Sequence, residues 1–422
     1  MSGVDSFAHF GRRNGELYIE QLPLNSIGAK FGTPCYVYSA AVLRDNFDAY
    51  ASALRGRDHL ICYAVKACSN IAILQLLARR GAGFDIVSVG ELERVLLAGG
   101  DPDKVVFSGV AKTPSEMRRA LEVGIHCFNV ESAAELEVLA EVAEQLGQRA
   151  AVSLRVNPDV DAGTHPYIST GLKENKFGIA IDQATAIYQR AAALPSIEVV
   201  GVDCHIGSQL TDATPLLDAL DRLLALIDQL AALDIELRHI DLGGGLGVRY
   251  CDEQPPTADD YLSQVLTRLE GRDLRLVLEP GRSIVANSAV LLTETIYLKQ
   301  SGDKHFAIVD AAMNDMLRPS LYQAWMALEN TATSDAPEQR YDVVGPVCET
   351  GDWLAKDRPL RLRSGDRLAL FSAGAYGFTM SSNYNSRTRA AEILVDGERC
   401  QLIREREALA DLTRGEHLLD QE

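Results

Sequence analysis

Long apolar runs are absent from the 422-residue sequence, and so are dense clusters of basic residues. Nowhere do about 18 apolar residues follow one another, and the segment 1–20 contains no apolar signal core. The formal net charge is -18, with 41 Lys and Arg against 59 Asp and Glu, which disfavours binding to nucleic acid or to an anionic membrane. We therefore expect a cytoplasmic protein with neither nucleic-acid nor membrane partners.

Cysteine pairs of the kind that bind zinc are also missing. The eight cysteines are scattered without a CxxC pair or a Cys/His spacing typical of metal sites, so they are interpreted as reduced thiols and no metal site is predicted. What the chain does contain is 47% hydrophobic and 24% charged residues, a composition typical of a globular protein with a substantial core. Its length favours two domains.

The middle of the chain, from about residue 59 to 282, alternates short β-branched runs with longer helical patterns. The stretches 90–98 and 215–233 repeat apolar residues at spacings of three and four, as a helix packed on a sheet requires. Repeated strand-helix units with eight strands predict a (β/α)8 barrel rather than an open doubly wound sheet. The predicted strands are 60–66, 84–88, 105–109, 126–130, 151–156, 199–206, 237–242 and 275–279.

Beyond the predicted barrel, strand patterns follow one another without long helices, which predicts a second, mainly β domain. The N-terminal segment 1–33 contains the strand-like run Leu17-Tyr-Ile, and we expect it to pack with the β domain. The expected domains are therefore a barrel at 34–284 and a β domain at 285–422. The polar stretch 331–340 is predicted to be a loop. The predicted strands of the β domain are 289–298, 305–310, 341–348, 367–372 and 391–395.

Lys66 ends the apolar run Ile61-Cys-Tyr-Ala-Val and is the most informative residue of the chain. A lysine that is desolvated at a strand end offers a neutral amine near neutral pH, and such an amine attacks aldehydes to form Schiff bases. A lysine can equally mark the point where a strand reaches water. The functional interpretation is favoured because seven more predicted strands also end at polar or glycine-rich residues.

These strand ends predict one pocket, because the reacting groups of a (β/α)8 barrel gather at the carboxyl ends of its strands. Some polar strand ends occur in any barrel, but a lysine, a histidine, a glycine-rich turn and an acidic-basic pair together indicate a site. The predicted lining residues are Lys66, Asp85 with Ser88, Ser108, Asn129, Arg155 with Asn157, His205 with Ser208, Gly243 to Gly245, and Glu279 with Gly281 and Arg282.

The glycine run Gly243-Gly-Gly-Leu-Gly247 follows the seventh predicted strand, where barrels often bind phosphate through backbone N–H groups. Glycines also serve tight turns, but Gly281-Arg282 after the eighth strand supports a phosphate site. The run comes too late in the chain for a dinucleotide-binding fingerprint.

A Schiff-base lysine and a phosphate cradle in one pocket predict pyridoxal 5'-phosphate as the cofactor. Glu279 is suited to keep the pyridine nitrogen of this cofactor protonated, and an ion pair with Arg282 is the alternative reading of that carboxylate. His205 is either a residue that lies flat on the cofactor ring or a structural histidine.

Several of these runs resemble the alanine-racemase-fold, or fold type III, decarboxylases that use pyridoxal phosphate. The resembling runs are Tyr63–Lys66, His205–Gln209, Gly243–Gly245, Glu279–Arg282, Gly345–Glu349 and Gly374–Gly377. Four segments are similar to motifs of the diaminopimelate decarboxylase family: Ser169–Gly178, Arg318–Tyr322, Cys348–Asp352 and Tyr376–Arg387. The resemblance covers about residues 30–395, and Cys68 departs from it because asparagine is the commoner residue there.

The resemblance implies a role for each of these residues. Lys66 would hold the cofactor, His205 would stack on its ring, and Glu279 would bind the ring nitrogen. The cofactor-binding set implied in this way is Lys66, Asp85, His205, Ser208, Gly244, Gly245, Glu279, Gly281, Arg282 and Tyr376. The substrate-binding set is Arg282, Arg318, Tyr322, Glu349 and Tyr376.

The resemblance also implies that Cys348 is a proton donor offered by the partner subunit, and hence a homodimer with a shared site. The implied reaction converts meso-2,6-diaminopimelate to L-lysine and carbon dioxide, the last step of lysine biosynthesis. An ornithine- or arginine-type decarboxylase on the same fold and a non-catalytic pyridoxal phosphate-binding protein are the alternatives. Arg318 disfavours the first, because a substrate that ends in an ammonium group alone needs no arginine.

Overall fold

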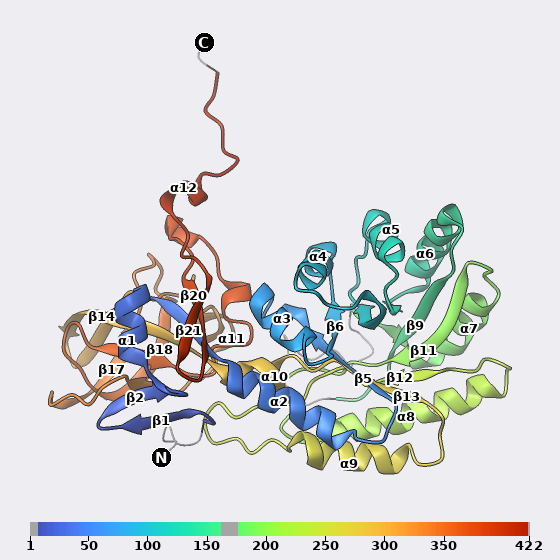
Figure 1. Cartoon of the computed structure of the whole chain (residues 1–422), viewed down its shortest axis with the longest axis horizontal. Helices are drawn as coiled ribbons and strands as arrows, with labels where there is room; N and C mark the ends of the chain where they lie inside the picture. The colour runs from blue at the N-terminus through green and yellow to red at the C-terminus, as the bar shows by residue number, and fades with distance from the viewer. Residues whose placement is uncertain (1–6, 162–175, 421–422) are drawn as a thin grey trace. The chain divides into compact units, whose positions relative to one another are not determined.

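The structure is a computed structural model that describes residues 7–161 and 176–420, so most of the predicted motif 169–178 lies outside the described residues. The chain divides into two compact units (Figure 1). The β unit comprises 1–43, 250–252 and 285–422, and the barrel unit comprises 44–249 and 253–284. Within the described ranges, no helix is long and apolar enough to cross a membrane.

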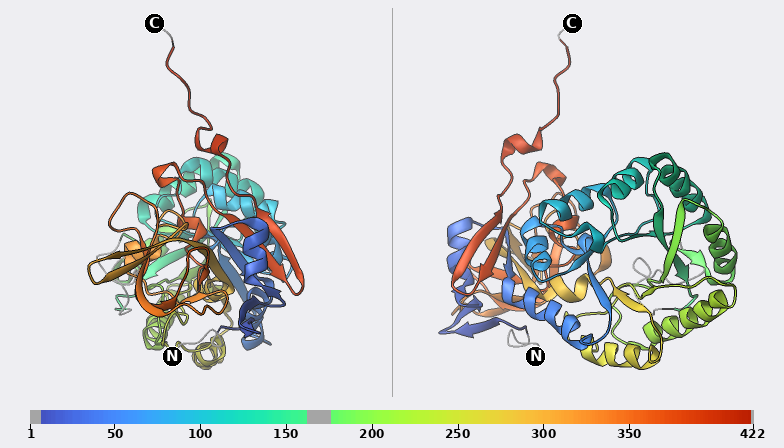
Figure 2. Two further views of the ribbon diagram at one scale, coloured as in Figure 1. Left: turned by 90° about the vertical axis from the view of Figure 1, so that its left-hand side faces the viewer. Right: turned by 45° about the vertical axis from the view of Figure 1, so that its right-hand side comes forward.

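The barrel unit contains a closed ring of eight parallel strands, which confirms the predicted fold. The ring closes because β13 pairs with β5 and β8 pairs with β9. Figure 2 shows helices surrounding these strands. In ring order the strands are β5 (His59–Ala64), β6 (Gly83–Ile86), β7 (Val105–Phe107), β8 (Cys127–Val130), β9 (Ala150–Asn157), β11 (Ile197–Asp203), β12 (His239–Asp241) and β13 (Arg275–Leu278), and the short β10 (Ile179–Ala180) pairs with β9.

The barrel helices begin and end where the sequence provides caps. Thr113 and Glu116 form a capping box at the start of α5, and Gly124 ends that helix in the left-handed conformation that glycine adopts without strain. One face of α8 buries nine apolar residues at helical spacing. The helices are α2 (Ala40–Ala53), α3 (Ile71–Ala78), α4 (Val89–Leu97), α5 (Pro114–Val123), α6 (Ala133–Leu146), α7 (Ile181–Ala192), α8 (Thr214–Ala231), α9 (Ala258–Arg268) and α10 (Arg282–Val285).

The β unit is built on a sheet of order β18-β17-β15-β14-β4-β20-β21, with β19 paired to both β14 and β16. The N-terminal strands lie in this unit, as expected, and Leu17 of β2 is fully buried in its core together with Val290 and Phe371. The strands are β1 (Phe10–Arg13), β2 (Glu16–Ile19), β3 (Leu22–Pro23), β4 (Cys35–Ser39), β14 (Ala289–Ser301), β15 (Lys304–Val309), β16 (Leu328–Asn330), β17 (Glu338–Val344), β18 (Trp353–Arg361), β19 (Arg367–Leu370), β20 (Ala391–Asp396) and β21 (Arg399–Arg404), and the helices are α1 (Leu24–Phe31), α11 (Arg318–Tyr322) and α12 (Leu409–Leu412).

Two predicted segments of the β unit need correction. The strand predicted at 341–348 ends at Val344, and it begins at Glu338 inside the stretch predicted as a loop. Strand β18, which contains Pro359 and several charged residues, is absent from the predicted strands. It lies at the edge of the sheet, where polar residues and proline are tolerated in strands.

The expected boundary after residue 33 differs from the division that the structure shows. Strand β4 follows immediately, and it pairs antiparallel with β14 and parallel with β20. Residues up to Leu43 therefore belong to the β unit.

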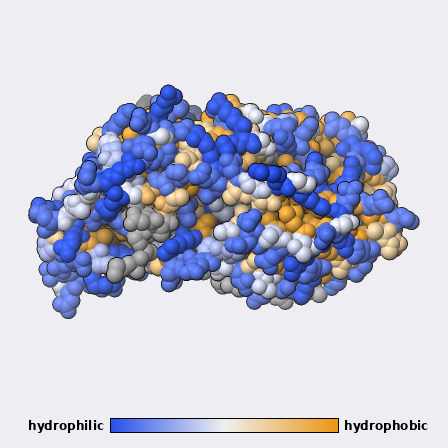
Figure 3. Space-filling model, turned by 60° about the horizontal axis from the view of Figure 1, so that its bottom comes forward, coloured by the Kyte–Doolittle hydropathy of each residue, from blue (hydrophilic) through white to orange (hydrophobic). Residues whose placement is uncertain are grey.

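Figure 3 shows one face of the molecule, on which hydrophilic residues predominate, in keeping with the 24% of charged residues in the sequence.

A pair of histidines, the half-buried His126 and the buried His239, lies at the end of the barrel where the strands begin. The rings of His126 and His239 lie 5.7 Å apart, and the Nε2 atoms of both rings have no hydrogen-bond partner among the described residues. Burial lowers the pKa of His239 to about 3, so the ring is neutral. The ring fits because residue 201 is glycine: a Cβ there would lie 2.1 Å from His239 Nε2.

We predict that Gly201→Ala destabilises the protein by about 1–3 kcal/mol, the usual cost of overpacking a core. Urea unfolding followed by circular dichroism measures this free energy. Gly11→Ala, in a strand with no atom within 4 Å of the added Cβ, is the matched control. The cost should shrink in a His239→Ala background, because the clashing ring is gone. An equal cost in both backgrounds would contradict this account of the packing.

Candidate active site

Lys66 pairs with Asp85 at the carboxyl end of the barrel strands. Lys66 lies in a 3-10 turn, Val65–Ala67, because β5 ends two residues earlier than predicted. Its Nζ atom is 2.5 Å from Asp85 Oδ2, and its side chain is 35% exposed, whereas that of Asp85 is fully buried. The expectation of a desolvated lysine is therefore wrong, because the amine is half-buried and ion-paired. The buried carboxylate of Asp85 fixes the direction in which this amine points.

Glu279 follows β13 and is held by two neighbours from other strands. Its Oε1 atom accepts hydrogen bonds from Asn129 Nδ2 at 3.0 Å and from Ser108 Oγ at 3.3 Å. Asn129 also donates to Ser108 Oγ at 3.1 Å. All three side chains are buried. The structure thus brings together three of the predicted lining residues and fixes the orientation of the Glu279 carboxyl group.

Two buried aspartates that the sequence analysis did not single out lie beside Glu279. One carboxyl oxygen from each of Asp203, Asp241 and Glu279 lies within 4.8 Å of the other two. Asp241 Oδ1 accepts the Gly243 N–H at 2.8 Å, whereas Asp241 Oδ2 and Asp203 Oδ1 have no hydrogen-bond partner among the described residues. Their sequence signal is an acidic residue inside an apolar strand, as in Val202-Asp203 and Ile240-Asp241.

These carboxyl groups cannot all be ionised so close together in a buried site. Burial, followed by the charge of Asp241, raises the pKa of Asp203 and of Glu279 well above their usual ranges. Burial raises the pKa of Asp241 to about 7. The group therefore holds protons near neutral pH. Three such oxygens could also ligate a cation, but the guanidinium of Arg155, 4.0 Å from Asp203 Oδ2, opposes a second positive charge.

Arg155 and Asn157 are engaged in structural contacts. Arg155 forms an ion pair with Glu131 at 2.9 Å, and Glu131 also accepts the Gly178 N–H at 2.9 Å. Asn157 Nδ2 donates to the Phe177 carbonyl at 2.9 Å. These two predicted lining residues therefore tie the ends of β9 to the segment around residue 178.

Ser88, a predicted lining residue, is the N-cap of α4. Its Oγ atom accepts the Glu91 N–H at 3.2 Å. Glu91 was not predicted as a site residue, yet it lies close to the Lys66–Asp85 pair, and its carboxylate accepts the Val87 N–H at 2.7 Å. Burial raises the pKa of Glu91 to about 7. The spacing of Ser88 and Glu91 is that of a helix cap, which is the signal for this arrangement.

The glycine-rich turn after β12 brings its backbone close to neighbouring backbone. Gly243 and Gly245 have φ of +62° and +105°, a region that favours glycine. A Cβ on Gly244 would lie 2.4 Å from the Glu279 carbonyl oxygen, and one on Gly281 would lie 3.0 Å from Ala64 Cβ. Glycine is therefore required at these positions by close packing, and glycine-rich turns of this kind are the backbone from which phosphate cradles are built.

Three more predicted side chains follow β11 and β13: His205, Ser208 and Arg282. Arg282 Nη2 and Nε donate to Ser208 Oγ at 2.9 and 3.1 Å, so these predicted residues are brought together. His205 Nδ1 accepts the Gly244 N–H at 3.2 Å. Burial, with the charges of Arg155 and Lys66, lowers the pKa of His205 well below its usual range, so the ring is neutral and any proton lies on Nε2.

The remaining predicted site residues belong to the β unit. Arg318 begins α11 and is buried with its guanidinium 4.5 Å from the centre of the Tyr250 ring, and Tyr322 ends the same helix. Cys348 and Glu349 lie exposed in the loop between β17 and β18. Tyr376 has φ of +55°, an uncommon conformation for a residue other than glycine.

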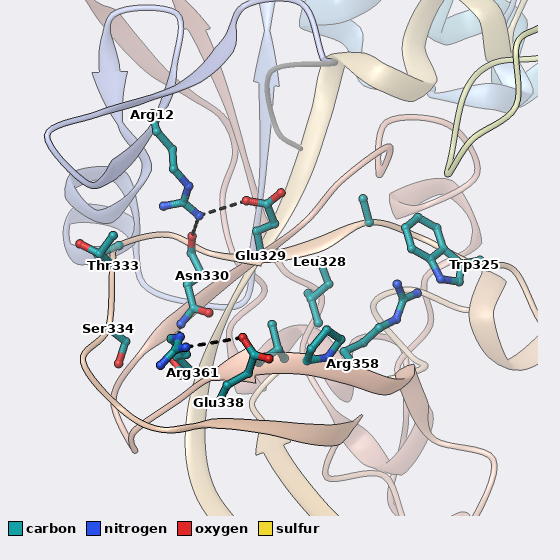
Figure 4. A pocket seen from close by; sticks show the side chains of 14 residues that line it. Arg12, Trp325, Leu328, Glu329, Asn330, Thr333, Ser334, Glu338, Arg358 and Arg361 are labelled. Atoms are coloured by element: carbon teal, nitrogen blue, oxygen red, sulfur yellow. Dashed lines mark hydrogen bonds and ion pairs between the residues drawn. The ribbon is translucent and has the colours of Figure 1, made fainter. Parts of the chain in front are cut away.

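The β unit contains a pocket of about 500 Å³ (Figure 4). Two ion pairs lie in its lining, Arg12 with Glu329 at 3.1 Å and Arg361 with Glu338 at 3.7 Å, and the Arg358 guanidinium lies over the Trp325 ring. None of the predicted site residues lines this pocket. We therefore assign it no part in the chemistry of the barrel.

The chain is similar to known proteins over nearly its whole length. The family described as "Pyridoxal-dependent decarboxylase, pyridoxal binding domain" matches residues 40–286. A diaminopimelate decarboxylase from Pseudomonas aeruginosa is 66% identical over 99% of this chain and 100% of its own length. One from Vibrio cholerae is 58% identical over 97% and 98%. The crystal structure of the Helicobacter pylori diaminopimelate decarboxylase complexed with L-lysine matches with a TM-score of 0.90 and 45% identity, covering 93% of this chain and 98% of the other.

The proton held by Asp241 predicts a pH-dependent effect of Asp241→Asn. Because the folded pKa of about 7 exceeds the unfolded value of 3.8, this carboxyl group contributes stability that is full below pH 3.8 and is lost as the pH rises through 7. Asparagine cannot ionise, so the variant should gain unfolding free energy over the unmodified protein as the pH rises. The gain is on the order of 1 kcal/mol per pKa unit.

Urea unfolding at several pH values, without added cofactor, measures this gain. Asp273→Asn, at an exposed position of the same unit, is the control and should follow the unmodified protein at every pH. Parallel pH profiles for Asp241→Asn and the unmodified protein would show that Asp241 is ionised throughout.

Proposed function

Because the chain belongs to the diaminopimelate decarboxylase family of the pyridoxal-dependent decarboxylases, we propose that it converts meso-2,6-diaminopimelate to L-lysine and carbon dioxide. The protein is a carboxy-lyase, and its reaction is the last step of lysine biosynthesis. The proposal is carried by three contacts of the barrel unit. Lys66 forms an ion pair with Asp85, Asn129 donates a hydrogen bond to Glu279, and Arg282 donates one to Ser208. A lysine, an acid and a phosphate cradle are the three parts that this chemistry requires.

The barrel residues fit pyridoxal 5'-phosphate. When bound, this cofactor supplies an aldehyde for amines and a protonated ring that accepts the electrons left by the departing carboxylate. Lys66 would hold its aldehyde carbon, and the backbone at Gly244, Gly245, Gly281 and Arg282, with the Ser208 hydroxyl, would hold its phosphate. The fit is supported by the close backbone approach at the glycine turn, where a Cβ on Gly244 would lie 2.4 Å from the Glu279 carbonyl oxygen, and by the hydrogen bond from Arg282 that fixes the Ser208 hydroxyl.

Glu279 would hold a proton between its carboxyl group and the ring nitrogen. The raised pKa of Glu279 means that its carboxyl group readily carries a proton when no ligand is near. A positively charged ring nitrogen would compensate the negative charge of the carboxylate in place of that proton. Ser108 and Asn129 keep the carboxyl group from rotating. His205, neutral and fixed by the Gly244 N–H, offers a flat ring that adds no positive charge. Asp85 directs the Lys66 amine.

Substrate choice would depend on residues of the β unit. Diaminopimelate carries a second amino-acid group at its far end, so both a carboxylate and an ammonium must be bound there. Arg318, with Arg282 and Tyr322, would bind the distal carboxylate, Glu349 would bind the distal ammonium, and Tyr376 would contact both substrate and cofactor. Charge-assisted contacts of this kind are roughly twice as strong as neutral hydrogen bonds. An ornithine-type substrate offers no carboxylate to the arginines.

Cys348 would deliver the proton to Cα after carbon dioxide leaves. Its exposed thiol suits a group that acts on a site outside its own loop. We propose that this site belongs to a second copy of the chain, so that the active enzyme is a homodimer with shared sites. A cytoplasmic location stays a prediction of the sequence.

The reaction is tested by measuring carbon dioxide release with pyridoxal phosphate and each of four substrates: meso-diaminopimelate, ornithine, arginine and lysine. We expect release from diaminopimelate alone, with lysine formed in equal amount. Only this substrate has both a distal carboxylate for Arg318 and a distal ammonium for Glu349. Samples without added cofactor are the control. Release from a basic amino acid would contradict the proposed specificity, and no release from any of them would favour a non-catalytic binding protein.

The shared site is tested by mixing two inactive variants. Lys66→Ala removes the amine of one site and Cys348→Ala removes the proton donor of the other, so each homodimer should be inactive. Mixed dimers contain one site with both residues intact and should recover up to about a quarter of the activity when the chains pair at random. Activity is measured after co-refolding or co-expression. Two inactive variants that show no recovery would argue that Cys348 serves its own subunit.

A further inference from the structure

The loop that carries Cys348 and Glu349 lies against a second turn of the β unit. This second turn, which we call the 384–385 turn, consists of Tyr384 and Asn385 within the 3-10 segment Tyr384–Ser386. Asn385 Oδ1 accepts the backbone N–H of Cys348 at 2.7 Å. The turn therefore holds the backbone of a residue that the proposed function requires.

Asn385 is suited to this contact by its backbone. Its φ of 55° and ψ of 29° lie in the left-handed region, which asparagine tolerates better than most residues other than glycine. This conformation presents the side-chain amide toward the neighbouring loop. The Cys348 N–H, in a solvent-exposed loop, would otherwise rely on water.

The 384–385 turn is itself anchored to buried residues. Asn314, which is 1% exposed, accepts the Ser382 N–H through its carbonyl at 2.9 Å and the Arg387 Nε–H through its Oδ1 at 2.9 Å. Arg387 is also 3.9 Å from the buried carboxylate of Asp315. The turn is thus fixed on both sides, before Tyr384 and after Ser386.

The loop of Cys348 has a separate anchor at its own ends. Asp352 Oδ2 accepts the Val347 N–H and Asp352 Oδ1 accepts the Met313 N–H, both at 2.7 Å. Cys348 and Glu349 project beyond this anchor, and both are exposed. These hydrogen bonds fix only the ends of the loop. The orientation of its tip depends on the contacts that the tip itself makes, and the 384–385 turn provides one through Asn385.

We propose that Asn385 is a positioning residue for the decarboxylation, because it fixes the backbone of Cys348. The inference rests on the proposed function, because it assumes that the Cys348 thiol serves the reaction. Asn385 then governs proton delivery, which sets kcat, and has little effect on substrate recognition, which sets KM.

Two variants separate positioning from folding. Asn385→Gly keeps the left-handed backbone and removes the acceptor, and Asn385→Asp keeps both. Asn14→Gly is the matched control, because Asn14 is an exposed asparagine with φ of 50° in the hairpin between β1 and β2. Both positions are exposed and lie in turns, so we expect unchanged melting temperatures.

The first measurement is steady-state kinetics of the holoenzyme with meso-diaminopimelate. Loss of one hydrogen bond should lower kcat roughly three- to tenfold in Asn385→Gly, with KM within about twofold. Asn385→Asp should recover most of this loss, and Asn14→Gly should show none. Equal losses in the glycine and aspartate variants, or a loss accompanied by a lower melting temperature, would overturn the positioning role.

The second measurement is the rate of Cys348 alkylation by iodoacetamide as a function of pH, quantified by peptide mass spectrometry. Asn385→Gly should change the rate severalfold, and Asn385→Asp should move the profile to higher pH because a carboxylate disfavours the nearby thiolate. Unchanged profiles in both would overturn the inference. Because alkylation does not depend on turnover, normal turnover of Cys348→Ala together with shifted profiles would reject the thiol's role in the reaction while supporting its positioning by Asn385.

Discussion

The pairing of β13 with β5 closes the barrel, and the contacts of the candidate site depend on this closure. Lys66 follows β5 and Glu279 follows β13, so closing the ring brings the first and last strands of the unit together. The Ala64 N–H donates to the Pro280 carbonyl at 3.2 Å just above the paired strands. Without this closure, neither Glu279 nor Gly281 would meet the residues of the other strand ends.

Closure also concentrates acidic groups in a space that excludes water. Asp85, Asp203, Asp241 and Glu279 are all nearly inaccessible, and the nearby cations are Lys66 and Arg155. Such an imbalance is costly unless protons or a cationic ligand compensate it. A ligand that brings a positive ring nitrogen and takes up the lysine would suit this environment, and the acidic interior would then favour its binding.

The sequence predicts the barrel well because its signal is local and repeated: apolar strands alternate with amphipathic helices, and eight such units leave few other folds. It also predicts which residues meet at the strand ends, as Ser108, Asn129 and Glu279 do. It could not predict that Lys66 lies in a turn beside Asp85, because that contact depends on where β5 stops. The pairing of β4 with β14 and β20 is equally invisible, since it joins residues more than 250 positions apart in the chain. Likewise, Asp203 and Asp241 gain significance only from their neighbours across the barrel.

The proposed chemistry depends most directly on which residue holds the cofactor. Reduction of the pyridoxal phosphate-loaded protein with borohydride, followed by peptide mass spectrometry, would locate the attached cofactor directly. The account predicts that the added mass lies on Lys66. Attachment to another lysine, such as the buried Lys112, or the absence of any modified peptide would contradict it.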